Sequence, residues 1–264
     1  MSKQVEAVVG YLKHSFSVQS KYHIHSPFVF DFYSKVLQNG QHYPQYRVVN
    51  RLRRELETVS RFIKRKDLGV NGKDYPCDQR FVRVKDLVHH SSVNRKNGEL
   101  LFRLIRHYKP SSILELGTSL GLSTIYFGLA APESMIITIE GCIDSVNLAH
   151  ENFEKAGLKN VRVITGNFDE KLSQALAEMP SPDLVFIDGN PKKEPTLAYF
   201  EHCLQHIHTG TVLIIDGIHL SRGMTEAWNT ICAHPRVKVS IDIYCMGIVF
   251  FKEELSKEDF VLRY

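Results

Sequence analysis

The chain has 264 residues, of which 43% are hydrophobic and 23% charged, a balance that suits a globular protein with one substantial core and excludes wholesale disorder. No run approaches the roughly 18 apolar residues of a membrane helix, and the first residues lack a signal-peptide pattern, so we expect a cytoplasmic protein. The five cysteines form no CxxC pair, which favours unpaired thiols over a zinc site.

The first part of the chain has helical character. Apolar residues recur at helical spacing in Val5–Phe16, Val29–Leu37 and Arg51–Lys66. The segment Asp67–Pro76 is rich in Gly, Asp and Lys and reads as a loop. Ser91–Tyr108 begins with a Ser-Ser cap candidate and continues as an amphipathic helix.

Aromatic and histidine residues are dense in Tyr22–Phe30. Within this segment Ser26 and Pro27 can start a helix, with proline in the first turn. One interpretation is an aromatic staple that packs onto the main domain, because such rings carry a large apolar area. The other is a lid over a substrate.

The net charge of +4 is unevenly distributed. Arg47–Lys96 contains fourteen Lys and Arg against six Asp and Glu, a local excess of +8, which leaves −4 for the remainder. A solvated helical face is the simplest explanation of such a run. An anionic partner is the alternative.

A regular alternation of short apolar runs and helical stretches begins after Pro110. The apolar runs predict strands at Ser112–Leu116, Met135–Ile139, Val161–Thr165, Leu184–Asp188 and Thr211–Asp216. The stretches between them predict helices at roughly Leu122–Ala131, Asp144–Ala156, Asp169–Glu178 and Pro195–His206. This order is typical of parallel strands joined by crossover helices, and the unbroken apolar runs indicate strands covered on both faces.

The end of the chain changes this pattern. Met224–Cys232 is helical, and Arg236–Ile243 and Met246–Lys252 are two strands separated by almost nothing. So short a connection predicts an antiparallel hairpin.

The sequence from Ile113 to Thr124 leads from a buried strand through glycines into a helix, a turn that suits a polar ligand at the carboxyl edge of a sheet. A dinucleotide fits poorly, because its G-x-G-x-x-G spacing is absent. Gly117, Ser119 and Gly121 spell the G-x-S-x-G of a hydrolase elbow, yet such an elbow follows several strands and almost none precede this one. S-adenosylmethionine explains more of the residues.

Polar residues recur at successive strand ends. Glu115 lies just before the turn, where a carboxylate can meet the cofactor's ammonium group or an ordered water. Glu140 ends the next strand, where an acid can hold ribose hydroxyls. Gly166–Phe168 follows the third strand and offers an amide and a stacking ring for adenine, and Asp188 ends the fourth.

The motifs ExGTSxGxST, IEG, GNF, FIDG and IIDGIH resemble the class I S-adenosylmethionine-dependent methyltransferases, and within them the catechol and caffeoyl-CoA O-methyltransferase-like branch. The resemblance covers roughly Lys96 to Lys252. It implies an α/β, Rossmann-like, doubly wound and mostly parallel seven-stranded sheet with an antiparallel last strand. The cofactor contacts that we expect are Glu115, Gly117, Ser119, Ser123, Glu140, Gly141, Asn167, Phe168 and Asp188.

The resemblance also implies a divalent metal that binds and acidifies the acceptor oxygens. Asp188, Asn190 and Asp216 are the expected Mg²⁺ ligands, although Gly217 stands where the family has a further ligand. Two carboxylates and an amide oxygen still suit this hard ion.

For the chemical step we expect Asp188, His219 and Lys192. His219 follows the fifth strand and is a candidate for the lost ligand or for the base. The family's catalytic lysine aligns with Pro191, and Lys192 comes next, so the base assignment stays open.

We expect two parts, a helical N-terminal segment over residues 1–95 that forms a lid or substrate region, and a cofactor-binding domain over residues 96–264. The expected acceptor is a hydroxyl oxygen of a small molecule. RNA, held by the basic 47–96 region, and a catalytically weak scaffold are alternatives. A homodimer is also left open.

Overall fold

The computed structural model describes residue 18 and residues 24–66 and 79–264. The predicted helix Val5–Phe16, the predicted loop Asp67–Pro76 and Cys77 therefore lie outside the described residues. The chain divides into two compact units. The central unit is residues 39–179, and the C-terminal unit joins the segment before residue 39 to residues 180–264.

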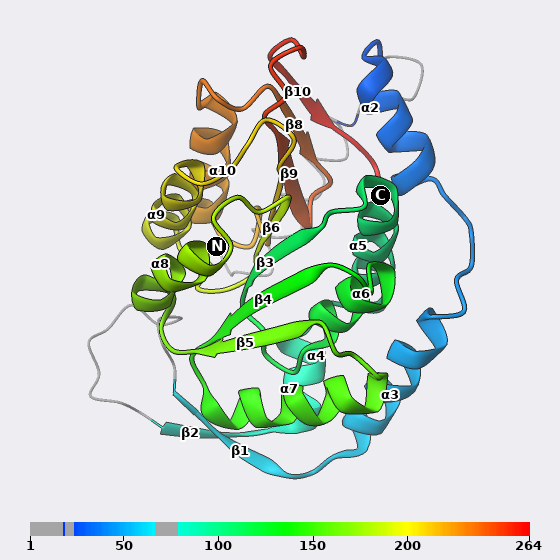
Figure 1. Ribbon diagram of the computed structural model, residues 1–264, viewed down its shortest axis with the longest axis vertical. Helices are drawn as coiled ribbons and strands as arrows, with labels where there is room; N and C mark the ends of the chain where they lie inside the picture. Colours follow the sequence, from blue (N-terminus) through cyan, green and yellow to red (C-terminus); the bar gives the residue numbers. More distant parts are fainter. Residues whose placement is uncertain (1–17, 19–23, 67–78) are drawn as a thin grey trace. The chain divides into compact units, whose positions relative to one another are not determined.

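The central unit alternates helices with strands. Its elements are α3 (Tyr46–Thr58), β1 (Phe62–Lys66), β2 (Gln79–Arg83), α4 (Val84–His90), α5 (Arg95–Tyr108), β3 (Ser112–Leu116), α6 (Leu122–Ala130), β4 (Met135–Glu140), α7 (Ile143–Ala156), β5 (Val161–Thr165) and α8 (Phe168–Glu178). Strands β3, β4 and β5 are parallel neighbours in that order, and Figure 1 shows them side by side. Helices α6, α7 and α8 pack on these strands, and α3 packs on α6 and α7.

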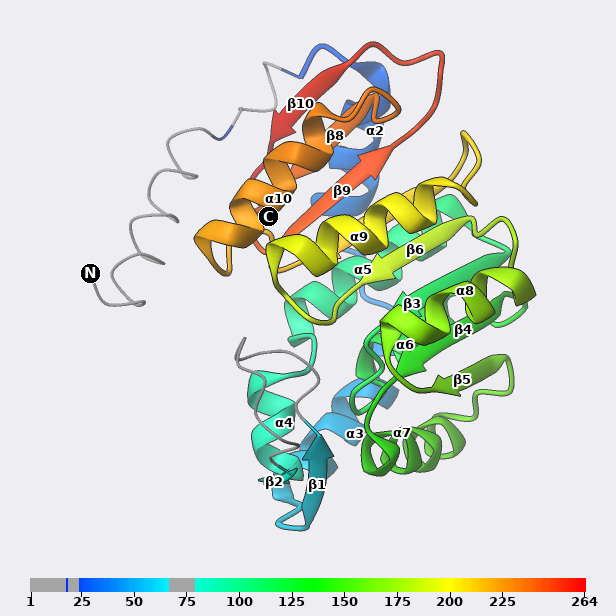
Figure 2. The same cartoon turned by 90° about the vertical axis from the view of Figure 1, so that its left-hand side faces the viewer.

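Where the structure describes it, the C-terminal unit contains five further strands and three α-helices. Its elements are α2 (Pro27–Phe32), a π-helical turn (Tyr33–Leu37), β6 (Leu184–Ile187), α9 (Lys193–Leu204), β7 (Val212–Asp216), α10 (Arg222–Ala233), β8 (Val239–Asp242), β9 (Met246–Phe250) and β10 (Glu258–Val261). The strand order is β10-β8-β9-β7-β6, with only β9 antiparallel to its neighbours. Helices α9 and α10 lie side by side on one face of these strands, and α2 lies on the other (Figure 2).

The five parallel strands predicted between Ser112 and Asp216 begin and end within one residue of the observed ones, whereas β8 begins three residues later than predicted and β9 ends two residues earlier. Their side chains are buried without alternation in β3, β6 and β7, as expected for strands covered on both faces. The predicted hairpin is also confirmed, since β8 pairs with β9 antiparallel. One strand was not expected: β10 pairs in parallel with β8, which gives eight strands where seven were predicted.

The predicted helix over Arg51–Lys66 is wrong in its second half. Helix α3 ends at Thr58, and Phe62–Lys66 is a strand that pairs antiparallel with β2. Phe62 is exposed, Ile63 is buried and Lys64 is exposed, so the burial there alternates with the period of a strand. The side chain of Asp144 also accepts the backbone N–H of Lys64 at 2.8 Å, which holds this strand.

The helix expected from Ser91 begins later. Asn94 is its N-cap, and the Asn94 side chain accepts the backbone N–H of Asn97 at 2.9 Å, so α5 starts at Arg95. At the other predicted start, Ser26 caps α2 and Pro27 is its first residue, as expected. Among the described residues, no helix combines the length and the apolarity that crossing a membrane requires.

The aromatic segment before residue 38 packs as the staple interpretation predicts. The Phe28 ring lies edge-on to the Phe250 ring of β9 with centroids 4.9 Å apart, and Phe32 lies 6.0 Å from the same ring. The ammonium group of Lys252 lies 5.4 Å from the Phe28 centroid. These contacts attach α2 to the sheet of the C-terminal unit.

Candidate functional site

The turn between β3 and α6 has a left-handed backbone. Gly117 and Gly121 have φ of 109° and 77°, and a Cβ atom at Gly121 would come within 2.5 Å of the Phe153 ring. Ser119 has φ of 48°, a conformation that costs a non-glycine residue free energy and is characteristic of functional sites. The Ser119 hydroxyl is buried without a hydrogen-bond partner, so this turn leaves one polar atom for a ligand to satisfy.

Glu115 lies under this turn and has no exposed surface. Its carboxylate accepts the hydroxyls of Ser123 at 2.5 Å and Thr138 at 2.7 Å, together with that of Thr124. Burial raises the pKa of Glu115, and the three hydroxyl donors oppose that shift. The carboxylate thus ties β3, β4 and the first turn of α6 together from inside.

Glu140 ends β4 and reaches the same turn from the neighbouring strand. Its Oε2 accepts the Ser119 N–H at 2.8 Å, and its Oε1 accepts the Cys142 N–H at 2.9 Å. The residue between, Gly141, is partly exposed. An ionised carboxylate offers about four lone-pair positions, so each Glu140 oxygen keeps capacity for a further hydroxyl. We call residues 115–123 with Glu140–Cys142 the cofactor turn.

Asn167 and Phe168 follow β5, parallel to β4, and both are partly exposed. Asn167 is the N-cap of α8, and its side-chain oxygen accepts the Asp169 N–H at 3.4 Å. This capping role fixes the asparagine at the carboxyl edge of β3, β4 and β5. The structure therefore brings the ends of the three parallel strands β3, β4 and β5 to one edge, as predicted.

The expected metal ligands belong to the C-terminal unit. Strands β6 and β7 pair in parallel, with Ile187 opposite Ile215, so Asp188 and Asp216 follow at adjacent positions. Asn190 has φ of 52°, and its Nδ2 donates to the Tyr199 hydroxyl at 3.3 Å. We call Asp188, Asn190 and Asp216 the acidic edge.

Two features of the acidic edge suit a cation. The Asn190 Oδ1 is buried and has no hydrogen-bond partner. Burial raises the pKa of Asp216 to about 7, which reflects a carboxylate with little solvent to stabilise its charge. Within the described ranges, however, no three His, Cys, Asp or Glu side chains gather as a metal site, so this set depends on the asparagine.

The His219 ring has hydrogen-bond partners on both nitrogens, whereas a base or a replacement metal ligand needs an available nitrogen. Its Nε2 lies 2.6 Å from Asp242 Oδ2, and its Nδ1 lies 3.1 Å from the Thr225 hydroxyl. The Tyr244 ring stacks on the imidazole at 5.3 Å. Both ring nitrogens therefore make hydrogen bonds within the C-terminal unit.

Asp242 and Tyr244 hold His219 in place, although neither is predicted from the sequence as a site residue. Asp242 ends β8, and its Oδ1 accepts the Tyr244 N–H at 2.7 Å. An acid at the end of a predicted strand, two residues before a tyrosine, was the available signal. The resemblance to the methyltransferase family implies no role for either position.

The lysines after the acidic edge lie at the start of α9. Lys192 is its N-cap residue and is partly exposed. Lys193 is its first residue, and its Nζ lies 2.9 Å from Glu226 Oε2. Lys193 therefore forms an ion pair, and Lys192 remains the lysine predicted for the chemical step.

Comparisons with known proteins agree with this geometry. Residues 114–218 match a family described as a methyltransferase domain. The chain is 34% identical over 130 residues to a catechol O-methyltransferase of Niastella koreensis and 31% identical over 129 residues to one of Mycobacterium tuberculosis. Each match covers 48% of this chain, and the chain spans only 58% and 57% of those relatives' lengths.

A solved structure is similar over most of the chain. The O-methyltransferase from Bacillus cereus, in complex with S-adenosylhomocysteine, is 22% identical, with a TM-score of 0.56. The match covers 84% of this chain and 97% of that one. At this identity the likeness concerns the fold alone, and it confirms the predicted doubly wound α/β fold.

Proposed function

Because the chain carries a class I S-adenosylmethionine-dependent methyltransferase domain similar to the catechol O-methyltransferases, we propose that it transfers a methyl group from S-adenosylmethionine to a hydroxyl oxygen of a small molecule. The observation that carries this proposal is the cofactor turn. Its left-handed Ser119 has a buried hydroxyl without a partner, and the Glu140 carboxylate lies within hydrogen-bond distance of the Ser119 N–H.

The cofactor turn holds the methyl donor in this proposal. Gly117, with its positive φ and no side chain, permits close approach of the cofactor, and the N-terminus of α6 favours its carboxylate. Glu140 accepts the ribose hydroxyls with its free lone pairs. Asn167 and Phe168 contact adenine by hydrogen bonding and stacking.

The proposal gives Glu115 a positioning role instead of the direct contact expected from the sequence. Its carboxylate is fully buried, and it accepts hydrogen bonds from Ser123 and Thr138. We propose that it fixes the geometry of the turn to which the cofactor binds. Asp188, directly after β6, keeps two proposed roles: it contacts the cofactor, and it is a metal ligand of the acidic edge.

The acidic edge would hold Mg²⁺ through the carboxylates of Asp188 and Asp216 and the amide oxygen of Asn190, the oxygen donors that this ion prefers. Support comes from the Asn190 Oδ1, which is buried without a hydrogen-bond partner, and from the Asp216 carboxyl, whose pKa is raised by its surroundings. Bound Mg²⁺ supplies Lewis-acid polarisation of the acceptor hydroxyl. These side chains would then orient the acceptor for an in-line displacement.

We propose that His219 positions the loop after β7 and that Lys192 is the proton acceptor. His219 is held between Asp242 and Thr225, which leaves neither ring nitrogen free. Lys192 precedes α9, directly after the residues that follow β6. A lysine acts as a base only when its surroundings lower its pKa, so the bound acceptor must provide part of that environment.

The acceptor class follows from the relatives. Two of them are named catechol O-methyltransferases, so an aromatic molecule with adjacent hydroxyls is the proposed acceptor class. Nothing in these comparisons favours an RNA acceptor or a scaffold role. A cytoplasmic location stays an expectation from the sequence. A homodimer stays a prediction.

Calorimetric titration with S-adenosylhomocysteine tests the donor half of this proposal. Glu140→Gln should weaken binding by about tenfold or more, because the ribose loses a charged acceptor. Glu133→Gln removes an exposed carboxylate of the same unit and should leave the affinity unchanged. Wild-type protein that is folded yet gives no heat and no thermal shift would contradict the proposal.

The acceptor half is tested by methyl transfer to catechol with and without Mg²⁺. We expect product only with the metal, and a loss of at least about a hundredfold in Asp216→Asn. S-adenosylhomocysteine affinity should be unaltered in the same variant. Equal turnover in the presence of a chelator would remove Mg²⁺ from the mechanism and leave the donor assignment intact.

A further inference from the structure

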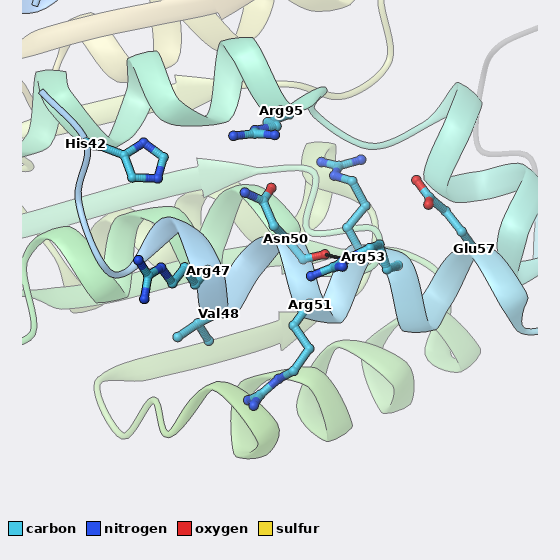
Figure 3. Close-up of a pocket in the computed structure, with 9 residues that line it drawn as sticks. His42, Arg47, Val48, Asn50, Arg51, Arg53, Glu57 and Arg95 are labelled. Carbon is cyan, nitrogen blue, oxygen red and sulfur yellow. Dashed lines mark hydrogen bonds between the residues drawn. The ribbon is translucent and has the colours of Figure 1, made fainter. Parts of the chain in front are cut away.

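Arginines line a pocket on α3, within the central unit. This pocket shares no residue with the cofactor turn. Its volume is about 730 Å³, and Figure 3 shows its lining, most of which comes from α3, with Arg95 from α5 and His42 from the segment before α3. The lining comprises five arginines, one glutamate and three further residues: His42, Arg47, Val48, Asn50, Arg51, Arg53, Arg54, Glu57 and Arg95.

The pattern of α3 explains why these residues share a face. Its buried side chains are Tyr46, Val49, Leu52 and Leu56, at helical spacing. Arg47, Arg51 and Arg54 follow the same spacing on the exposed side. The helix therefore presents an arginine stripe to solvent, because residues three and four apart are surface neighbours.

Acidic neighbours neutralise only part of this charge. Arg95 forms an ion pair with Glu99 at 2.8 Å, and Arg51 lies 3.9 Å from Glu55. Glu55 is shared, since Lys155 approaches it at 3.7 Å. Arg54 donates its Nε–H to a backbone carbonyl of its own helix. Like charges at this spacing destabilise a helix, so the stripe costs stability unless an anion occupies it.

Arg53 ties the pocket to the interior of the central unit. It is partly buried, and its guanidinium donates to the backbone carbonyl of Val93, the residue before the α5 cap. Its Nε is buried and has no hydrogen-bond partner. Burial lowers the pKa of Arg53. The Tyr126 hydroxyl of α6, an electrostatic neighbour of Arg53, is likewise buried without a partner.

We propose that this arginine pocket binds a phosphate-bearing small molecule of nucleotide size. Guanidinium groups bind phosphate oxygens through paired, charge-assisted hydrogen bonds, and five arginines line this pocket with one carboxylate. The volume falls within the usual range of about 300–1,000 Å³ for small-molecule sites. Asn50 and His42 add hydrogen-bonding groups that can contact the remainder of the ligand.

A small ligand fits these observations better than a nucleic acid does. The arginine stripe extends over little more than two turns of α3, from Arg47 to Arg54, which matches one group of phosphates. A strand of RNA would need contacts along many phosphates and aromatic surfaces for stacking. Among the lining residues none is Phe, Tyr or Trp.

The test is calorimetric titration of the full chain with ATP, in the absence of divalent cations and at about 150 mM salt so that only close contacts contribute. Inorganic phosphate and a single-stranded RNA of about 20 nucleotides are titrated in parallel. The variant R47Q/R54Q removes two exposed arginines of the pocket. R106Q removes an exposed arginine of α5 that does not line it.

We expect ATP to bind the wild type and R106Q with affinities within about twofold of each other, and R47Q/R54Q to bind at least about tenfold more weakly. S-adenosylhomocysteine binding, measured on the same samples, should be equal in all of them, which shows that the variants are folded. Inorganic phosphate should bind more weakly than ATP at the same site.

Three results would overturn the proposal. The first is the absence of heat from ATP with protein that still binds S-adenosylhomocysteine. The second is an equal loss in R47Q/R54Q and R106Q, which would show diffuse charge attraction. The third is RNA binding about a hundredfold tighter than ATP binding, steeply dependent on salt and lost in R47Q/R54Q, which would make this face an RNA surface.

Discussion

Within the central unit, the cofactor turn and the arginine pocket differ in how far their charged side chains are compensated by the rest of the chain. Glu115 is fully buried, yet three hydroxyls from its own chain donate to it. Arg47 and Arg54 are exposed, and their own chain supplies too few acids to balance them. The turn is therefore built to keep one conformation, whereas the pocket carries charge that a ligand has to balance. Substitutions in the turn should reduce stability strongly, and substitutions in the pocket should barely affect it.

The largest effect is expected at Gly121. Gly121→Val places a β-branched side chain at φ of 77° and within 2.5 Å of the Phe153 ring. Backbone strain and overpacking together should lower the free energy of unfolding by about 4 kcal/mol. Urea unfolding measures this change.

Gly40→Ala is the control for Gly121→Val, because a Cβ at Gly40 meets nothing within 4 Å and its backbone has no positive φ. Its stability should stay within about 0.5 kcal/mol of the wild type. If both variants were equally stable, the proposal that the cofactor turn keeps one fixed conformation would be wrong.

The next effect is expected at Glu115. Glu115→Ala leaves the hydroxyls of Ser123, Thr124 and Thr138 without their common acceptor inside the core. We expect a loss of about 3 kcal/mol in the free energy of unfolding, together with weaker S-adenosylhomocysteine binding. Measured at a temperature where the variant is still folded, unaltered affinity would exclude the proposed positioning role.

A smaller effect concerns pH. Burial raises the pKa of Glu115, with three hydroxyl donors opposing the shift, so the folded chain keeps this proton to higher pH than the unfolded chain does. The stability that this group contributes is present below its unfolded pKa and is lost as pH rises through its folded pKa. Glu115→Gln does not titrate, so its stability should fall less than that of the wild type as pH rises through the folded-state pKa of Glu115. Parallel stability curves for the two proteins would contradict this assignment.

The smallest effect, and the one with the opposite sign, is expected in the arginine pocket. Arg47→Gln removes one member of the like-charged pair with Arg51 at i,i+4. The free energy of unfolding should rise by about 0.3 kcal/mol at low salt, and the difference should vanish in high salt. A clear loss of stability would mean that Arg47 is neutralised within its own chain, and the contrast with the turn would fail.

Sequence reasoning predicted well the parts of the fold that depend on unbroken apolar runs. Strands such as Ser112–Leu116 and Leu184–Ile187 are buried along almost their whole length, so their composition alone marks them. It failed for strands that are short or whose formation depends on contacts with another element. Phe62–Lys66 has only five residues and depends on β2 and Asp144, and Glu258–Val261 depends on β8.

The same distinction applies to the candidate site. Polar residues such as Glu140 and Asn167 follow adjacent parallel strands. The order of the elements implies this arrangement, so their position at one edge of the sheet could be predicted. The sequence does not tell which way a side chain faces. Glu115 is turned inward by three hydroxyls, and His219 is held by Asp242, a residue 23 positions away. These pairings exist only once distant strands are assembled.

The packing of Phe28 and Phe32 on Phe250 has a consequence for biosynthesis. The ribosome makes α2 first, but the ring on which it packs belongs to β9, more than two hundred residues later. The central unit emerges in between, with partners for its own strands already available. Since domains fold as units during synthesis, α2 has to wait for the end of translation before it docks, and that docking closes a long loop. Truncated nascent chains that stop before β9 should therefore expose this aromatic helix to chaperones.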